Sequence, residues 1–316
     1  MLWAICRPRF RRFAPTALLA LAGAFSGIAG AADQATTFRF NPPDGITGVG
    51  TSRSTNVAMV ALDGQTRKMT EEKETTHKRV MVKLDHGFQL TETVVSWAYK
   101  VDGKPQSDAL LAATQGCDVV STYDQNGRLQ SLRGADVLME RVQENYRKAG
   151  KRIPEEMTQN WMERRMRADW QIGEGDLIGR SAKVGSWWIA KHEIPEAQVG
   201  DVMMYSFTKV ARRVKSAGQD CVEVTYRYDT DPKALAKTIG KSVNDIIRAT
   251  GPLSSPAADV RFTESGTLVI DPATMLKYHR KSQRAARIVM SRGDVSVPVS
   301  ITGGSEHSYK YTNARW

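Results

Sequence analysis

The residue types that most often do chemistry are spread thinly through this chain. Its five histidines form neither an H-x-H pair nor an H-E-x-x-H motif; they are His77, His86, His192, His279 and His307. His192 is followed by Glu193, but no second histidine follows at the spacing that would place two ring nitrogens on one helix face. The sequence therefore predicts no metal site.

Motifs for nucleophilic and nucleotide chemistry are missing too. Gly185-Ser186-Trp187 does not complete a G-x-S-x-G nucleophile elbow, and neither a phosphate loop nor a dinucleotide fingerprint is present. The adjacent carboxylates Glu71-Glu72 and Glu155-Glu156 are typical of a charged strand edge and of a helix start. We therefore predict a non-enzymatic protein with no catalytic residue and no cofactor. The alternative is an enzyme whose site forms from distant residues, such as a histidine with Asp118 or Asp271.

A methionine- and tryptophan-rich segment is the strongest indication of binding. Large, soft side chains repeat at helical spacing within residues 154–171: Met157, Trp161, Met162, Met166 and Trp170. Methionine offers an adaptable apolar surface, and Trp97 and Trp187 are expected to line the same cavity. The alternative is that these side chains only fill the space between a helix and a sheet.

The same segment is strongly basic. Arg164, Arg165 and Arg167 belong to a positively charged cluster between residues 141 and 167, and glutamates are interleaved with it. This mixture favours a solvated helix face. The alternative is contact with anionic headgroups at a membrane surface, or with another envelope protein.

The N-terminus has the pattern of a secretory signal peptide. Basic residues from Arg7 to Arg12 precede an apolar run at residues 14–28, which ends in Ala29-Gly30-Ala31. We predict cleavage near Ala31 or Ala32, which would place the mature protein in the periplasm or outside the cell. Loss of residues 1–31 removes four of 45 basic residues and none of 34 acidic ones, so the mature net charge is 41 minus 34, or +7. That charge favours solubility and gives no argument for nucleic acid as a partner.

Two cysteines, Cys117 and Cys221, remain after the predicted cleavage. Because an oxidising compartment permits disulfides and the count is even, we predict that they pair. Two buried thiols are the alternative.

Most of the mature chain alternates apolar and polar residues with a period of two, as half-buried strands do. Strands are predicted at residues 57–62, 79–84, 88–99, 118–123, 128–132, 202–214, 221–228, 260–270, 284–302 and 306–312, with Asn126-Gly127 as the clearest hairpin turn. Helices are predicted at residues 134–149, 154–171 and 232–251. The pattern predicts a single α+β domain at residues 32–316, with β-rich halves at about 36–150 and 185–316 joined by a helical segment at about 154–172.

The exported N-terminus, the turn at residues 124–129 and the late strand at residues 266–271 resemble the LolA-like superfamily of periplasmic lipoprotein carriers, and related secreted bacterial families. The resemblance implies a large, curved antiparallel sheet, half-barrel-like, with several helices packed on its concave face. We therefore expect an exported envelope protein that binds or carries a hydrophobic ligand such as a lipid or acyl chain. The alternative is a ligand-free structural or protein-interaction component with a fully packed interior.

Overall fold

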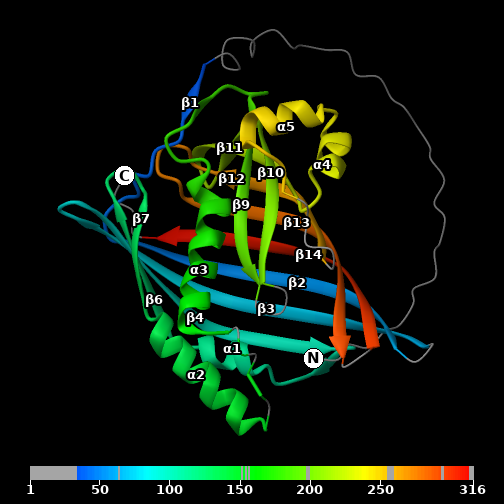
Figure 1. Cartoon of the computed structure of the whole chain (residues 1–316). Helices are drawn as coiled ribbons and strands as arrows, with labels where there is room; N and C mark the ends of the chain where they lie inside the picture. The colour runs from blue at the N-terminus through cyan, green and yellow to red at the C-terminus, as the bar shows by residue number, and fades with distance from the viewer. Residues whose placement is uncertain are drawn as a thin grey trace, which may run out of the picture.

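A large antiparallel sheet dominates the computed structural model, which describes residues 34–62, 65–150, 152–153, 155, 157–196, 200–254, 260–292 and 295–312 (Figure 1). The predicted signal peptide lies outside these residues. Within them, the strand order is β7-β6-β4-β3-β2-β14-β13-β12-β11-β10-β9, with β5 paired to β4. The sheet is not closed, so β7 and β9 are its two edges. The bounds are β2 (Ile46–Leu62), β3 (Gln65–Leu84), β4 (Gly87–Val101), β5 (Lys104–Pro105), β6 (Asp118–Asp124), β7 (Leu129–Arg133), β9 (Trp187–Glu196), β10 (Gly200–Ser216), β11 (Gln219–Asp229), β12 (Val260–Ile270), β13 (Lys277–Arg292) and β14 (Val295–Thr312).

The two β-rich halves share this sheet, because β2 from the first half pairs along its length with β14 from the second. Two short strands, β1 (Thr36–Thr37) and β8 (Ser181–Ala182), pair separately. The predicted Asn126-Gly127 turn lies between β6 and β7, where Gly127 has a φ of 76° that suits glycine.

The described ranges contain these helices: α1 (Ala109–Thr114), α2 (Ala135–Lys148), α3 (Gln159–Trp170), the π-helical turn η1 (Gln171–Gly175), α4 (Pro232–Ile239) and α5 (Val243–Thr250). The prediction for residues 134–149 is confirmed by α2. The single helix expected at residues 232–251 is two helices, because Gly240 ends α4 in the left-handed region and Ser242 starts α5 with a capping box. None of the helices in these ranges is long and apolar enough to cross a membrane.

Helices lie on both faces of the sheet at its β9–β11 end. Tyr205 and Phe207 of β10 pack with Leu235 of α4 and Ile246 of α5, whereas the alternate residue Met204 packs with Ile172 of η1. Successive side chains of a strand point to opposite faces, so α4 and α5 lie opposite to η1. This departs from the expectation that the helices pack on one concave face, because β10 is apolar on both sides.

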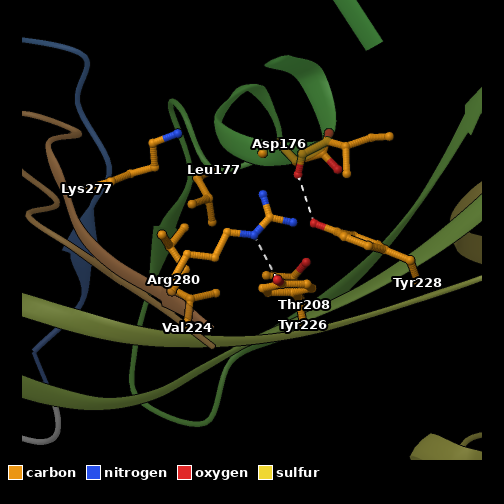
Figure 2. Close-up of a pocket in the computed structure, with 11 residues that line it drawn as sticks. Asp176, Leu177, Thr208, Val224, Tyr226, Tyr228, Lys277 and Arg280 are labelled. Atoms are coloured by element: carbon orange, nitrogen blue, oxygen red, sulfur yellow. Dashed lines mark hydrogen bonds between the residues drawn. The ribbon is translucent and has the colours of Figure 1, made fainter. Parts of the chain in front are cut away.

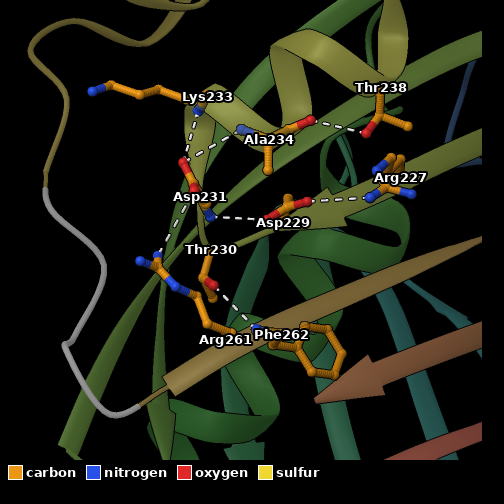
Figure 3. Close-up of polar contacts among 9 residues, drawn as sticks. All are labelled: Arg227, Asp229, Thr230, Asp231, Lys233, Ala234, Thr238, Arg261 and Phe262. Carbon is orange, nitrogen blue, oxygen red and sulfur yellow. Dashed lines mark hydrogen bonds and ion pairs between the residues drawn. The ribbon is translucent and has the colours of Figure 1, made fainter. Parts of the chain in front are cut away.

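A network of buried polar groups connects β11 to α4 (Figure 3). Asp231 caps α4 by accepting hydrogen bonds from two backbone N–H groups of its first turn. Asp229 accepts a hydrogen bond from the Asp231 backbone N–H at 2.9 Å and pairs with Arg227, and the fully buried Thr230 accepts one from the Phe262 N–H at 3.1 Å. Burial raises the pKa of Asp229, and the contacts with the Asp231 N–H and Arg227 oppose that shift by stabilising its charged form.

The predicted disulfide is not formed. Cys117 and Cys221 are free, buried thiols, and they belong to different clusters, one beneath α1 and α2 and the other around Tyr278 of β13. Cys117 precedes β6 and Cys221 lies in β11, and six strands separate β6 from β11 in the sheet. At about 4.8 Å per strand, this separation far exceeds the roughly 7 Å between Cα atoms that a disulfide can bridge. Cysteine count and compartment carry no information about this distance.

Candidate ligand-binding site

Helix α3 joins the two sides of the open sheet. Its N-terminus is capped by Thr158, whose hydroxyl accepts a hydrogen bond from the Trp161 N–H at 3.1 Å, and Met162 is buried against α2. Arg164 lies 2.6 Å from Asp201 of β10 and 3.2 Å from Glu193 of β9. Together, α3 and η1 form a helical strap that runs in front of the sheet in Figure 1.

The η1 turn is held on the sheet by buried polar contacts. Glu174 forms an ion pair with Lys277 of β13, and the Tyr228 hydroxyl donates to the Ile172 carbonyl at 3.1 Å. Just beyond η1, Asp176 Oδ2 lies 3.0 Å from His192 Nε2. Figure 2 shows Tyr228 and Arg280 rising from the sheet toward this turn.

A groove of about 540 Å³ lies between the strap and the sheet. This volume is within the roughly 300–1,000 Å³ of typical small-molecule sites. By contrast, the small cavities beside η1 hold about 20 and 30 Å³, on the order of one water molecule each. Apolar side chains line the groove on both sides: Val94, Val119, Leu129, Leu132, Leu138 and Met166 from the β4–β7 side, and Ile172, Ile194, Met204, Tyr228 and Phe262 from the β9–β12 side.

Charged and polar side chains lie between these apolar sides. We call them the polar strip: His77, Arg79, Glu92, Glu264, Lys277, Arg280, His307 and Tyr309. Arg79 Nη2 lies 2.7 Å from Glu92 Oε2. Arg280 Nη2 lies 2.9 Å from Glu264 Oε1, and Arg280 Nε donates to the Tyr226 hydroxyl at 2.8 Å. The groove therefore combines apolar walls with a band of permanent charges.

The strip's electrostatics favour neutral histidines beside charged arginines and carboxylates. Burial, followed by the nearby Arg280 and Lys277, lowers the pKa of His307 to about 4. Burial also lowers the pKa of His77. Burial alone would raise the pKa of Glu92, but Arg79 and His77 outweigh it and the net shift is downward. At neutral pH the strip therefore holds an ionised Glu92 and an uncharged His307 imidazole.

Glycines of β2 make room for the aromatic part of the strip. A Cβ on Gly50 would lie 2.6 Å from the Tyr309 ring, and one on Gly48 would lie 2.7 Å from the Tyr311 ring. The two rings can therefore lie over the β2 backbone. Arg79 takes up the space beside them, with its Cζ 4.7 Å from the Tyr309 ring centroid.

The predicted ligand-binding residues fall into different places. Met166 and Trp170 line the groove, and Trp170 also packs against Phe40 and Tyr123. Met157, Trp161 and Met162 belong to the α2–α3 cluster and so fill the core there.

The other two predicted tryptophans are not among the residues that line the groove. Trp97 is half-buried on β4, and its Nε1 has no hydrogen-bond partner within the described part of the chain. Trp187 lies on the α4–α5 face, stacked on Phe207 with Lys241 above its ring.

The predicted membrane-contact arginines are partly engaged within the protein. Arg164 pairs with carboxylates of β9 and β10, and Arg165 pairs with Asp169 and Glu196. Arg167 is exposed. Two of the three charges therefore attach the strap to the sheet edge.

Histidine–carboxylate contacts exist, but not with the predicted partners. Asp118 bonds to Thr93, and Asp271 accepts hydrogen bonds in the turn before β13. His192 contacts both Asp176 and Ser206 through the same atom, Nε2. A catalytic triad needs the acid and the serine on different ring nitrogens, and Ser206 is only 1% exposed. This cluster therefore lacks the geometry of a hydrolase. Within the described residues, no three His, Cys, Asp or Glu side chains gather as a metal site requires.

The polar strip was missed by sequence reasoning, although the sequence carries a signal for it. Every second residue from Glu71 to Arg79 is charged or polar, as are the alternate residues from Ser305 to Tyr309. In a strand, such positions share one face. The signal is recognisable only once these segments are known to be strands.

Comparisons with known proteins identify no family. No protein-family model matches the chain, and no curated protein matches it. A structure of lipid–protein interactions in lipovitellin matches with a TM-score of 0.45 and 10% identity, over 88% of this chain, which spans only 26% of lipovitellin. A Bacteroides fragilis protein described as exported, with a YmcC-like fold, gives a TM-score of 0.25 and 9% identity, over 88% of this chain and 100% of that one. A β-barrel-like protein with a domain of unknown function from Brucella abortus gives 0.22 and 10%, over 86% and 100%. At these TM-scores the likenesses carry no argument about function, and the LolA-like resemblance stays a prediction.

Proposed function

We propose that this chain is an exported, non-enzymatic envelope protein that binds a hydrophobic or amphipathic ligand in the groove beneath the helical strap. The observation that supports this proposal is the groove itself, with its volume of about 540 Å³ and apolar side chains on both sides. Apolar surface that is gathered in one open groove and left without a protein partner is typical of ligand-binding sites. The groove volume is many times the roughly 30 Å³ of one water molecule.

The energetics favour an alkyl or acyl chain. Burial contributes about 0.8 kcal/mol per CH₂ group, so ten methylenes contribute about 8 kcal/mol before the cost of association, which is about 4–15 kcal/mol. A ligand of this length binds usefully only if additional contacts assist it. Met166 and Trp170 of the strap offer such contacts from above, because they line the same groove as the sheet residues.

Native mass spectrometry of the protein from its own envelope, with solvent extraction, tests the proposal. We expect a reproducible adduct that extracts as an apolar or amphipathic molecule. An apo mass that stays unchanged after incubation with total envelope lipid would refute it.

A variant that reduces the groove volume provides the matched test. Leu132 lines the groove on the edge strand β7, so Leu132→Trp should weaken binding of a fluorescent fatty acid by at least about tenfold. Leu110→Trp is the control, because Leu110 is exposed on α1 and should leave the affinity unchanged. Equal affinities in both variants would place the ligand elsewhere.

A further inference from the structure

Some polar groups of the polar strip have no hydrogen-bond partner in the described structure, although its charged groups form ion pairs. Glu92 is paired with Arg79, Glu264 with Arg280, and Glu174 with Lys277. Arg79 Nε is buried and has no hydrogen-bond partner among the described residues. In the same part of the chain, no hydrogen bond engages the His307 ring or the Tyr309 hydroxyl. A buried donor without a partner costs free energy, so Arg79 Nε is suited to an acceptor supplied by a ligand. The partly exposed Tyr309 hydroxyl is free to join it.

Three cations lie near His307 and Tyr309 of β14. Arg79 is on the β3 side, and Lys277 and Arg280 are on the β13 side. Arg79 of β3 lies over the Tyr309 ring, and Lys277 Nζ is 5.6 Å from the centroid of that ring. Arg280 is the direct cross-strand partner of His307 in the β13–β14 register. After burial, the largest causes that lower the pKa of His307 are the cations Arg280 and Lys277. Each of the three cations is paired with a glutamate, so what they offer a ligand at this point of the groove is hydrogen-bond donors, chiefly the unpartnered Arg79 Nε.

Building on the proposed function, we propose that the ligand is a long-chain carboxylic acid whose carboxylate is held by Arg79, Arg280 and Tyr309. Its alkyl chain lies along the apolar residues on one or both sides of the strip. A single negative charge fits better than a phosphate dianion, because each arginine already neutralises one glutamate. Guanidinium groups bind carboxylates with favourable planar geometry.

A ligand series on the unmodified protein tests the head group. Dodecanoate, methyl dodecanoate and 1-dodecanol share a chain and differ at the head, and each is competed against the neutral apolar fluorophore N-phenyl-1-naphthylamine at pH 7.5. We expect dodecanoate to bind at least about tenfold more tightly than the ester and the alcohol, as charge-assisted hydrogen bonds predict. Equal binding of all three would overturn the carboxylate proposal and leave the hydrophobic function standing. Failure of the fluorophore and of all three ligands to bind would overturn both. Tighter binding of dodecyl phosphate or dodecylphosphocholine would also overturn the carboxylate proposal, by assigning the site to phosphate headgroups.

Variants then locate the head group. Arg280→Met alone would leave Glu264 buried without its partner, so the test replaces both with methionine in Arg280→Met/Glu264→Met. The double variant should lose the preference for dodecanoate and keep its affinity for 1-dodecanol within about twofold. Lys281→Met is the control, because Lys281 is the next residue on β13 and is exposed; it should retain the preference. An unchanged preference in the double variant would overturn the assignment.

Tyr309→Phe is a gentler second test. It removes only a hydroxyl that has no hydrogen-bond partner in the described chain, so folding should be preserved. We expect dodecanoate affinity to fall by at least about tenfold, the effect of one hydrogen bond to a charged acceptor. Unchanged affinity would exclude Tyr309 from the head-group site.

Discussion

One of the contacts that attach η1 to the sheet is the buried ion pair between Glu174 and Lys277, and breaking it should destabilise the protein strongly. The side chains of Glu174 and Lys277 are only 9% and 14% exposed. In Glu174→Gln the ammonium of Lys277 would remain in this poorly solvated position without its counter-charge. Removal of one partner of a buried pair costs about 3–5 kcal/mol. Typical domains are stable by only about 5–15 kcal/mol, so this loss would be a large share of the total.

Urea unfolding followed by circular dichroism measures the effect. With a slope of about 3 kcal/mol per molar urea, Glu174→Gln should lower the midpoint by roughly 1–2 M. The double variant Glu174→Met/Lys277→Met removes both charges and keeps apolar volume. It should recover most of the loss, since replacing a buried pair with apolar residues is often neutral or stabilising.

Glu144→Gln is the matched control. Glu144 pairs with Lys148 on the surface of α2, and the two side chains are 49% and 66% exposed. Exposed pairs one helical turn apart contribute little to stability, so the midpoint should hardly move. A cost below about 1 kcal/mol for Glu174→Gln would mean that water reaches the pair and that η1 is held by other contacts. If the double variant were as unstable as the single one, the destabilisation would come from a change in side-chain shape and not from the unpaired charge.

Three further outcomes are expected. Cys117 and Cys221 should both titrate as free thiols after unfolding. In the native protein they should react slowly with Ellman's reagent even at pH 8.5, because both are buried and burial raises the pKa of Cys221 to about 11. A mass two units lower, from a disulfide, would contradict this. Ser242→Ala, which removes the capping box of α5, should lower the unfolding free energy by about 0.5–2 kcal/mol, and no change in thermal unfolding would count against it. Gly50→Ala should displace the Tyr309 ring, since the new Cβ would lie 2.6 Å from it, and the displacement should change the near-ultraviolet circular dichroism. Gly173→Ala is the control, because no atom of the described residues lies within 4 Å of its new Cβ and its φ is not positive; it should leave that spectrum unchanged.

The strands that sequence reasoning found are those with an apolar face. Residues 118–123 and 128–132 were predicted as a hairpin and form β6 and β7, because apolar residues alternate there and Asn126-Gly127 marks the turn. The first half of β3 was missed. The prediction began at residue 79, whereas the strand starts at Gln65, and residues 65–78 show no apolar alternation because both faces of that segment are mainly polar. Pairing with β2 and β4 along both sides makes it a strand, and a local pattern does not contain that information.

The site was harder to predict than the fold for the same reason. The Met/Trp segment was recognised by its apolar spacing, yet only Met166 and Trp170 reach the groove, since a helix that packs against both α2 and the sheet has apolar residues in several directions. Which of them faces the groove depends on how α3 sits between α2, which precedes it in the chain, and the sheet edge at β9 and β10, which follows it. Arg79, Glu264 and Arg280 come from three strands, and only the sheet order brings them to one groove.

The polar, groove-facing side of β3 and β14 stabilises the fold less than apolar residues would, and this loss of stability is an argument for function. Ion pairs that are partly withdrawn from water barely repay their desolvation, so apolar residues at Arg79, Glu92, Arg280 and Glu264 would serve folding at least as well. Departures from the pattern that best supports folding tend to occur at functional sites. Here four of them occur together under the strap, beside a groove whose flanking walls are apolar. A ligand with an apolar chain and a charged end would use both features, whereas a purely apolar ligand would leave the charged band without a purpose.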